Sequence, residues 1–494
     1  MPAATRDSGV VLAIDAGTTG VRTRAVFADG RASIADYREF TQHYPQPGWV
    51  EHDAEEIWQA VRSTLQTVCS RLDAPIAAIG ITNQRETVVA IDRRTGAPLH
   101  RAIVWQDRRT AQRCDALSAN LPSVRATTGL VLDPYFSGSK VEWLQRNTDV
   151  HSNANVAFAT IDAFLVHRLT GGAHFATDVT NASRTLLFDI RSLRWSDEMC
   201  AMFGVDHRTL PDVVPSSGRI GVTVKDGAIP AGIPISGIAG DQQAALFGQA
   251  CFAVGSAKNT YGTGSFVLLN VGSTCPAPTT GMLTTVAWQL GNQPATYALE
   301  GAIFVTGAAV QWLRDGLNII AQSSDIGPLA ASVADSAGVV VVPAFAGLGS
   351  PWWDPYARGA IFGITRGTTR AHIARAVVES MVFQTRDVVD AMTRASGVAV
   401  RDLRVDGGAA VMDLMLQMQA DQLGVDVLRP TELETTAMGA AYLAGLAEGV
   451  WGSTDDIAAR WALEHRFTPS GADRDASHAQ WLRALERSRG WITA

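Results

Sequence analysis

The stretch VVLAIDAGTTGVRTRAVFADG, residues 10–30, is typical of an apolar strand and a second, alternating strand joined by a turn of small residues. The first strand ends at Asp15, Gly17–Gly20 form the turn, and an Asp-Gly pair closes the second strand. Such a turn lets backbone N–H groups and the hydroxyls of Thr18 and Thr19 surround an anion, while Asp15 holds its metal ion. It differs from a Walker-type loop, because no Gly-Lys-Ser/Thr follows and the chain continues into a strand. The stretch predicts a phosphate-binding hairpin, although an ordinary hairpin with a Gly-Thr turn has the same pattern.

The second half of the chain uses a similar device in KNTYGTGSFVLLNVG, residues 258–272. Gly262–Gly264 make the compact turn, and the apolar run Phe266–Leu269 follows as a strand. The two stretches share this pattern rather than a repeated sequence. Two strand-turn-strand loops about half a chain apart predict two related domains that face each other with a nucleoside triphosphate between them.

Composition narrows the classes of protein that fit. At 494 residues the chain is too long for one compact core, so we expect two domains. A net charge of −7 argues against nucleic acid or an anionic membrane as the main partner. We expect no integral membrane segment, and the start MPAATRDSGV lacks the apolar core of a secretion signal. The five scattered cysteines show no zinc-type spacing. These features predict a cytoplasmic protein with reduced thiols.

The predicted domains follow the alternation of strands and helices. We place an N-terminal domain at residues 8–250, a C-terminal domain at 258–453 and a peripheral helical tail at 454–494. The boundary falls after the strand IPISGIAG and the helix DQQAALFGQA that it feeds, residues 233–250. In the C-terminal half a helix is expected from about His372 to Met392, because its apolar residues recur at helical spacing.

Several polar residues follow predicted strands, where side chains commonly point into a cleft. Asp241 stands where a strand meets a helix, so its carboxylate either caps the helix or accepts a proton from a substrate hydroxyl. Arg85 and Glu86 form either a surface ion pair or a polyol clamp, because a guanidinium donates and a carboxylate accepts hydrogen bonds. In the second interpretation, Trp105 and Phe266 supply an apolar wall for the substrate.

Two glycine-containing segments of the C-terminal half suit a nucleotide. The turn DGGA, residues 406–409, permits the close backbone approach that adenine or ribose needs, although such turns are also ordinary strand–helix connections. In GAIFVTGAAVQ, residues 301–311, Gly307 lets a helix pass close either to a ligand or to a packing neighbour.

Taken together, the ordered motifs resemble the FGGY carbohydrate kinases, and within that family the members that phosphorylate glycerol. The resemblance runs from about Val10 to Trp451. Its motifs are IDAGTTGVR, ITNQRET, IVWQDRR, PYFSGSK, ISGIAGDQQAALFGQ, NTYGTGSF, EGAIFVTGAAVQWLRDGL, PAFAGLGSPWWDPYARGAIFGITRGT, VDGGA and ETTAMGAAYLAGLA. NQRET together with Trp105 and Tyr135 separates the glycerol-specific members from pentulose and hexulose kinases.

This resemblance implies an α/β actin-like ATPase fold, with two ribonuclease H-like domains that close over ATP and a polyol. It implies direct in-line transfer to glycerol, giving sn-glycerol 3-phosphate, with Asp241 as the base. The implied glycerol-binding residues are Arg85, Glu86, Trp105, Tyr135, Asp241, Gln242 and Phe266. The implied ATP-binding residues are Thr18, Thr19, Arg22, Thr263, Gly307, Gln311 and Gly408. Asp15 and Asp241 are implied to organise Mg²⁺, partly through water.

The chain also departs from the family pattern. Met412 and Asp413 stand where many members have an Asn pair after VDGGA, and Ser265 stands where Cys is common. Residues 214–237 contain neither the Gly-Gly-Thr-Arg loop linked to inhibition by fructose 1,6-bisphosphate nor the His-containing segment that is phosphorylated in some relatives. The resemblance further implies a homodimer or homotetramer.

Two other functions stay open at the level of sequence. One is a kinase for another small polyol or ketose, such as erythritol or a pentulose. The other is a non-enzymatic, actin-like nucleotide switch, which the two phosphate loops fit almost as well. Asp241 and the polyol-type cluster favour an enzyme, because a switch needs no hydroxyl-activating base beside a small-molecule pocket.

Overall fold

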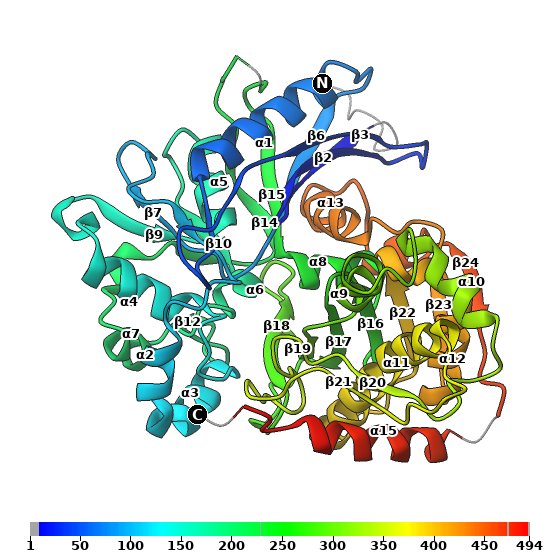
Figure 1. Cartoon of the computed structure of the whole chain (residues 1–494). Helices are drawn as coiled ribbons and strands as arrows, with labels where there is room; N and C mark the ends of the chain where they lie inside the picture. The colour runs from blue at the N-terminus through cyan, green and yellow to red at the C-terminus, as the bar shows by residue number, and fades with distance from the viewer. Residues whose placement is uncertain (1–8, 228, 472–473, 493–494) are drawn as a thin grey trace.

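The computed structural model describes residues 9–227, 229–471 and 474–492. The predicted domain start at Ser8 and most of the N-terminal segment used to exclude a secretion signal lie outside these ranges. Two large sheets lie in separate lobes, with helices between and around them (Figure 1). No helix in the described part of the chain is both long enough and apolar enough to span a bilayer.

The sheet of the N-terminal lobe is built on the hairpin that opens the chain. Its strands, in spatial order, are β14 (Ser217–Val222), β15 (Pro234–Gly240), β6 (Ile76–Asn83), β1 (Val10–Ala16), β2 (Gly20–Phe27) and β3 (Ile34–Glu39). The β1–β2–β3 meander is antiparallel, whereas β6 runs parallel to both β1 and β15. The carboxyl ends of β1, β6 and β15 therefore meet at one edge.

The sheet of the C-terminal lobe repeats this plan. Its strands, in spatial order, are β18 (Leu283–Trp288), β19 (Thr296–Ile303), β17 (Ser265–Gly272), β16 (Ser256–Tyr261), β22 (Asp402–Asp406), β23 (Asp426–Pro430) and β24 (Leu463–Phe467). Antiparallel β16, β17 and β19 are followed by β22 and β23, which run parallel to β16. The order β19-β17-β16-β22-β23 matches β3-β2-β1-β6-β15, which confirms the predicted pair of ribonuclease H-like domains.

Helices and small sheets surround this framework. The helices are α1 (Ala54–Cys69), α2 (Ala111–Ala116), α3 (Leu121–Thr128), α4 (Ser137–Asn147), α5 (Ile161–Leu169), α6 (Val179–Ala182), α7 (Asp197–Met202), α8 (Asp241–Gly248), α9 (Gly307–Gln311), α10 (Ile326–Ala331), α11 (Arg370–Ser396), α12 (Asp413–Leu423), α13 (Thr435–Ala447), α14 (Thr454–Ala458) and α15 (Asp475–Ser488). The small sheets pair β4 (Gln42–His43), β5 (Glu51–His52) and β8 (Ala102–Ile103); β7 (Val89–Asp92) and β9 (Val156–Ala159); β10 (Ala176–Asp178) and β13 (Asp212–Val214); β11 (Phe188–Asp189) and β12 (Arg194–Trp195); and β20 (Val340–Val342) and β21 (Ala360–Phe362).

Helices α8 and α13 join the two lobes. α13 comes from the C-terminal half of the sequence, yet it packs on β1, β6 and β15 of the first sheet, while α8 contacts β16 and β17 of the second. The two helices also pack on each other (Figure 1). Their crossing is close because two glycines lie in it: a Cβ added to Gly248 would lie 2.9 Å from the Thr435 carbonyl carbon, and one added to Gly439 would lie 2.6 Å from that of Ala244.

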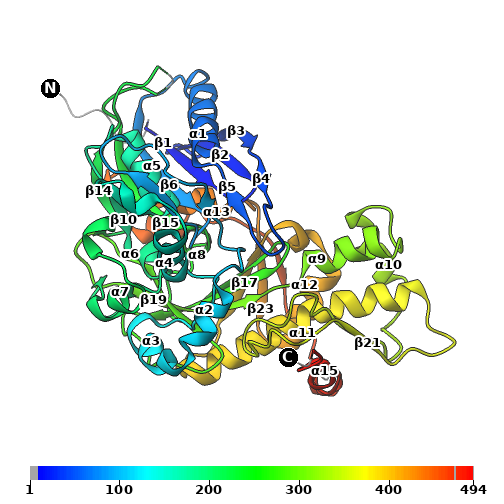
Figure 2. The same ribbon diagram turned by 60° about the vertical axis from the view of Figure 1, so that its left-hand side comes forward.

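The segment after residue 454 contributes more than helices. It adds α14, the edge strand β24 and α15, which contacts α11 and is seen nearly end-on below it in Figure 2. The Trp481 side chain of α15 is fully buried, and its indole N–H donates to the Asp387 carboxylate of α11 over 2.8 Å. The sequence analysis did not predict the strand.

Candidate active site

The first phosphate-type turn lies between β1 and β2, as the hairpin pattern predicts. Asp15 is the penultimate residue of β1 and is partly buried, while Thr18 and Thr19 form the turn. Burial, together with the negative charge of Asp241, raises the pKa of Asp15 to about 7. The positive charge of Arg22 opposes part of this rise. Two mutually repelling carboxylates at strand ends suit a hard divalent cation, which binds oxygen ligands, so this pair fits the Mg²⁺ that kinases use.

Arg22 connects this turn to the other lobe. It lies on β2, two residues beyond the turn, and forms an ion pair with Glu434, which immediately precedes α13. The neighbouring Arg24 pairs in the same way with Glu432. A guanidinium beside the phosphate turn is therefore held at the junction of the two lobes.

The second phosphate-type turn, Gly262–Gly264, connects β16 to β17. Its geometry explains Gly307: the amide of this first residue of α9 donates to the Gly262 carbonyl over 3.0 Å, and a Cβ there would lie 2.6 Å from the same oxygen. The Ala308 amide donates to the Thr263 carbonyl, also over 3.0 Å. Gly307 thus serves close packing of α9 against the turn, one of the two roles that its sequence context allowed.

The other candidate nucleotide-binding residues of this lobe, Gln311 and Gly408, lie at exposed positions near this turn. Gly408 follows the end of β22, which runs parallel to β16, and no atom outside its immediate neighbours lies within 4 Å of a Cβ added there. Gln311 is exposed at the last residue of α9. Met412 is partly buried and packs against the apolar core of this lobe, so it offers no polar side-chain group to a nucleotide.

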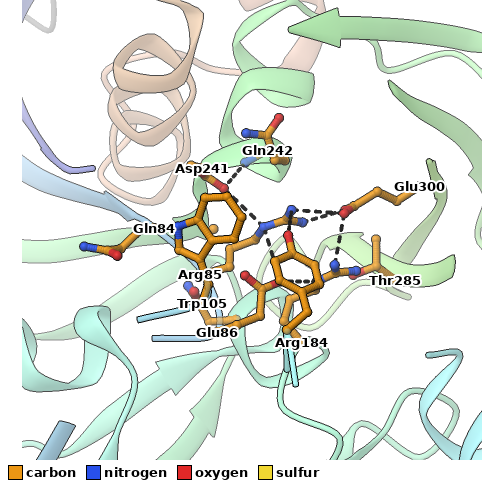
Figure 3. A network of polar contacts seen from close by, with 12 residues as sticks. Gln84, Arg85, Glu86, Trp105, Arg184, Asp241, Gln242, Thr285 and Glu300 are labelled. Carbon is orange, nitrogen blue, oxygen red and sulfur yellow. Dashed lines mark hydrogen bonds and ion pairs between the residues drawn. The ribbon is translucent and has the colours of Figure 1, made fainter. Parts of the chain in front are cut away.

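The polyol candidates converge on the carboxyl ends of β6 and β15 (Figure 3). Arg85 and Glu86 are each 2% exposed, which excludes the surface ion pair. The Arg85 Nε lies 3.1 Å from Oδ1 of Asp241, whose side chain keeps 30% of its surface exposed. The N-cap position of α8 is Gly240 and Asp241 is its first helical residue. Its Oδ1 still accepts a hydrogen bond from the Gln242 amide over 2.7 Å, so the carboxylate contacts the first turn of the helix as well as Arg85.

Aromatic rings line the same place. Trp105 makes edge-to-face contacts with Tyr135 at 5.6 Å and with Phe266 at 6.5 Å between ring centroids. The Tyr135 hydroxyl accepts a hydrogen bond from Arg85 over 3.3 Å. The indole N–H of Trp105 donates to Thr18 Oγ1 over 2.9 Å, which links the polyol wall to the first phosphate turn. All the predicted polyol residues therefore lie around one site.

Three charged residues at this site were not singled out from the sequence. Arg184 follows α6, Glu300 lies on β19, and Lys258 lies on β16 and donates to the side-chain carbonyl of Gln242. Two of them could have been found from the sequence, because residues 259–299 carry no charged side chain and Lys258 and Glu300 flank that stretch. A lone charge in an apolar strand commonly has a buried partner. Arg184 has no comparable signal.

Burial and charge act against each other in this network. Burial alone would raise the pKa of Glu300, but the guanidiniums of Arg184 and Arg85 lower it to about 2. For Glu86 burial prevails over the same two guanidiniums, and its pKa is raised. Burial lowers the pKa of Lys258 to about 8, against the opposing effects of nearby carboxylates.

Comparison with known proteins gives a consistent result. Residues 10–248 match the N-terminal domain of the FGGY family of carbohydrate kinases, and residues 257–448 match the C-terminal domain of that family. The glycerol kinase of Symbiobacterium thermophilum is 52% identical over 98% of this chain and 99% of its own length. The glycerol kinase of Deinococcus radiodurans is 52% identical over 97% of this chain and 98% of its own length.

Solved structures agree with these matches. The Plasmodium falciparum glycerol kinase with ADP superimposes with a TM-score of 0.92 at 34% identity, covering 99% of both chains. A xylulose kinase from Lactobacillus acidophilus shares the fold with a TM-score of 0.88 at 21% identity, over 98% of this chain and all of its own. The chain belongs to the FGGY family of carbohydrate kinases.

Proposed function

We propose that this protein is a glycerol kinase, which transfers the γ-phosphoryl group of ATP to glycerol and releases sn-glycerol 3-phosphate and ADP. One observation carries the proposal: a guanidinium and two carboxylates face aromatic rings beside a phosphate-type turn. Each hydroxyl of a polyol both donates and accepts hydrogen bonds, so Arg85 together with Glu86 and Asp241 matches both functions. Trp105 and Phe266 provide the apolar surface for the C–H groups. The full-length similarity to glycerol kinases supports this substrate over a ketose.

Asp241 is the proposed general base. Its carboxylate is the most exposed member of the charged cluster and lies at the first residue of α8, where β15 ends. It takes the proton from the attacking hydroxyl as that oxygen bonds to the γ-phosphorus. The bond from the γ-phosphorus to the β,γ-bridging oxygen breaks in the same step, and ADP leaves. No covalent enzyme intermediate is required.

The phosphate groups are assigned to the two turns. Thr18 and Thr19 present hydroxyls and backbone N–H groups from one lobe, and Thr263 presents its own from the other. Arg22 adds a positive charge at the junction of the lobes. Gly307, Gln311 and Gly408 border the space assigned to the nucleoside. Gln311 and Gly408 are exposed there, and Gly307 lets α9 pack closely against the second turn.

Asp15 and Asp241 are the proposed ligands of Mg²⁺, directly or through water. When bound, the ion neutralises charge that develops on the phosphate oxygens. Asp15 contributes a carboxylate at the end of a rigid strand, so its position is fixed by the sheet rather than by a loop.

The assignment to glycerol is tested by a coupled ADP-release assay with MgATP. The panel contains glycerol, dihydroxyacetone, erythritol, ribitol, xylulose and ribulose. We expect a glycerol-dependent rate well above the others. Turnover only with a larger substrate would retain the kinase and replace the polyol, whereas slow ATP hydrolysis that no polyol stimulates would favour the nucleotide switch.

The base assignment is tested with Asp241→Asn. We expect phosphoryl transfer to be lost while ADP binding, measured by calorimetry, stays detectable. Joint loss of ADP binding and of the folded state would instead give Asp241 a structural role.

Assembly and location complete the proposal. We infer a homodimer or homotetramer in the cytoplasm, supported by family resemblance and by the absence of a membrane-spanning helix from the described residues. Light scattering on the purified protein measures its assembly state, and cell fractionation measures its location.

A further inference from the structure

A buried carboxylate of the second lobe reaches the proposed polyol pocket of the first (Figure 3). Glu300 on β19 is fully buried. Its Oε2 accepts from Nη1 of Arg85 over 2.5 Å, and its Oε1 accepts from Nη2 of the same guanidinium over 3.0 Å. A bidentate ion pair of this kind fixes the plane of a guanidinium as well as its position. Glu300 therefore determines how Arg85 faces the pocket.

Arg184 holds the second polyol-facing residue in a comparable way. Its Nε donates to Glu86 Oε1 over 2.7 Å, and its Nη2 donates to Glu300 Oε1 over 3.0 Å. The backbone of Glu86 has a φ of 64°, a conformation that a residue with a Cβ adopts only when its surroundings impose it. The orientation of this carboxylate thus depends on a buried partner from a different part of the chain.

The charges of this group balance only when all four side chains are present. Arg85 and Arg184 carry two positive charges, and Glu86 and Glu300 carry two negative charges. Arg85 Nε also lies 3.1 Å from Asp241. If Glu300 lost its charge, Arg85 would keep Asp241 as a close alternative partner, and a buried unpaired guanidinium is costly. The guanidinium would then move toward Asp241 and into the space that the substrate hydroxyl needs.

This geometry, taken together with the proposed function on which it rests, leads us to propose that Glu300 and Arg184 are positioning residues of the glycerol pocket. Glu300 holds both Nη atoms of Arg85 and leaves the contact with Asp241 to Nε, and Arg184 holds the Glu86 carboxylate toward the substrate. Neither residue is assigned a contact with glycerol. Because Glu300 belongs to the second sheet and the other residues to the first lobe, the pocket is complete only where the two lobes meet.

The test measures kcat and the KM values of both substrates in Glu300→Gln. This change keeps the shape of the side chain and removes its charge. Loss of a charge-assisted pair predicts a rise of about 10- to 100-fold in the KM for glycerol. The KM for ATP should change by less than about 3-fold, because the nucleotide is assigned to other elements. Glu300→Asp, which keeps the charge, should recover part of the affinity for glycerol.

Glu142→Gln provides the matched control. Glu142 is also a buried carboxylate with two arginine partners, Arg113 at 2.7 Å and Arg146 at 2.8 Å, and none of the three belongs to the pocket. Its loss of charge should lower the melting temperature without raising the KM for glycerol relative to that for ATP. The comparison separates positioning from a general effect of breaking a buried ion pair.

Two results would overturn this inference. One is an unchanged KM for glycerol in folded Glu300→Gln, and the other is an equal rise in both KM values. If Glu300→Gln does not fold, Arg184→Lys is judged by the same criterion, since it keeps the charge and loses the guanidinium that bridges Glu86 and Glu300. A wild-type protein that shows no glycerol-dependent ADP release would reject the proposed function itself, which is a distinct outcome from a wild-type enzyme whose variants are unaffected.

Discussion

The crossing of α8 and α13 can be tested by adding one methyl group. In Gly439→Ala the new Cβ would lie 2.6 Å from the Ala244 carbonyl carbon and closer still to its oxygen. Favourable carbon–carbon contacts lie at about 3.5–4.0 Å, so the two helix backbones must separate by about 1 Å. The obstacle is backbone rather than a flexible side chain, and it cannot rotate away.

The magnitude follows from two opposing effects. Overpacking of this kind costs about 1–3 kcal/mol and occasionally more, whereas replacing Gly by Ala inside a helix returns about 1 kcal/mol. With a backbone obstacle we expect the upper end of the cost, hence a net loss of about 2 kcal/mol. Activity should fall further, because α8 carries Asp241 and a displacement of about 1 Å in a reacting group can cost on the order of 100-fold in rate.

The assay combines the apparent midpoint of chemical denaturation with kcat for glycerol. Gly327→Ala in α10 is the control, because a Cβ there would make an ordinary contact at 3.4 Å with the Met412 side chain. We expect the control to keep wild-type activity and to be at least as stable as the wild type, since it gains the helix preference of Ala without a clash. A Gly439→Ala protein as stable and as active as the wild type would refute the close-crossing argument.

Three further predictions concern single side chains. Trp105→Phe keeps an aromatic wall but loses the indole N–H that donates to Thr18. We expect the KM for ATP to rise by about 5-fold, which is the effect of losing one hydrogen bond of about 1 kcal/mol. An unchanged KM for ATP in steady-state kinetics would contradict the proposed connection between the polyol wall and the phosphate turn. Met412→Asn supplies a polar group beside the nucleoside and removes an apolar contact with the core. Calorimetry should show ADP binding about 3- to 10-fold tighter, and the melting temperature should fall slightly. Weaker ADP binding would contradict this prediction. At pH 8 a thiol reagent should modify the native protein fastest at its two partly exposed cysteines, because the other three are buried and burial raises their thiol pKa values furthest, which leaves little reactive thiolate. Fast reaction of more than two cysteines would contradict this prediction. Burial raises the pKa to about 11 for Cys114 and Cys200 and to about 12 for Cys251, and the partly exposed pair is Cys69 and Cys275.

Local sequence was enough to predict the hairpins and the residues at strand ends. The turn at Gly17–Gly20 lies between an apolar strand and an alternating strand, as predicted. The sheet then brings Arg85 and Asp241 together, because parallel β6 and β15 end at the same edge. Helix ends were less predictable. α11 begins at Arg370 because Thr369 and His372 cap it, and it ends before Gly397, whose φ is 69°.

Contacts between segments that are distant in the sequence could not be predicted from local sequence patterns. Arg184 and Glu300 meet only because β18, the sheet neighbour of β19, packs against α6, which the spacing of apolar residues in the sequence does not indicate. The same holds for β24, whose pairing with β23 depends on the path of the whole second lobe. Residues at strand ends were therefore found from sequence, whereas the residues that hold them in place required the tertiary structure.

The position of α13 has a consequence for biosynthesis. The first lobe leaves the ribosome early, but the apolar face formed by Val11, Ala13 and Ala78 is covered by Ala440 and Ala441, more than three hundred residues later. Until translation reaches α13, the nascent chain carries an uncovered sheet face of the kind that chaperones recognise and that aggregates when exposed. A stop codon placed just before residue 435 would therefore remove α13, α14, β24 and α15, so that the first sheet would stay uncovered and the second would lack its edge strand.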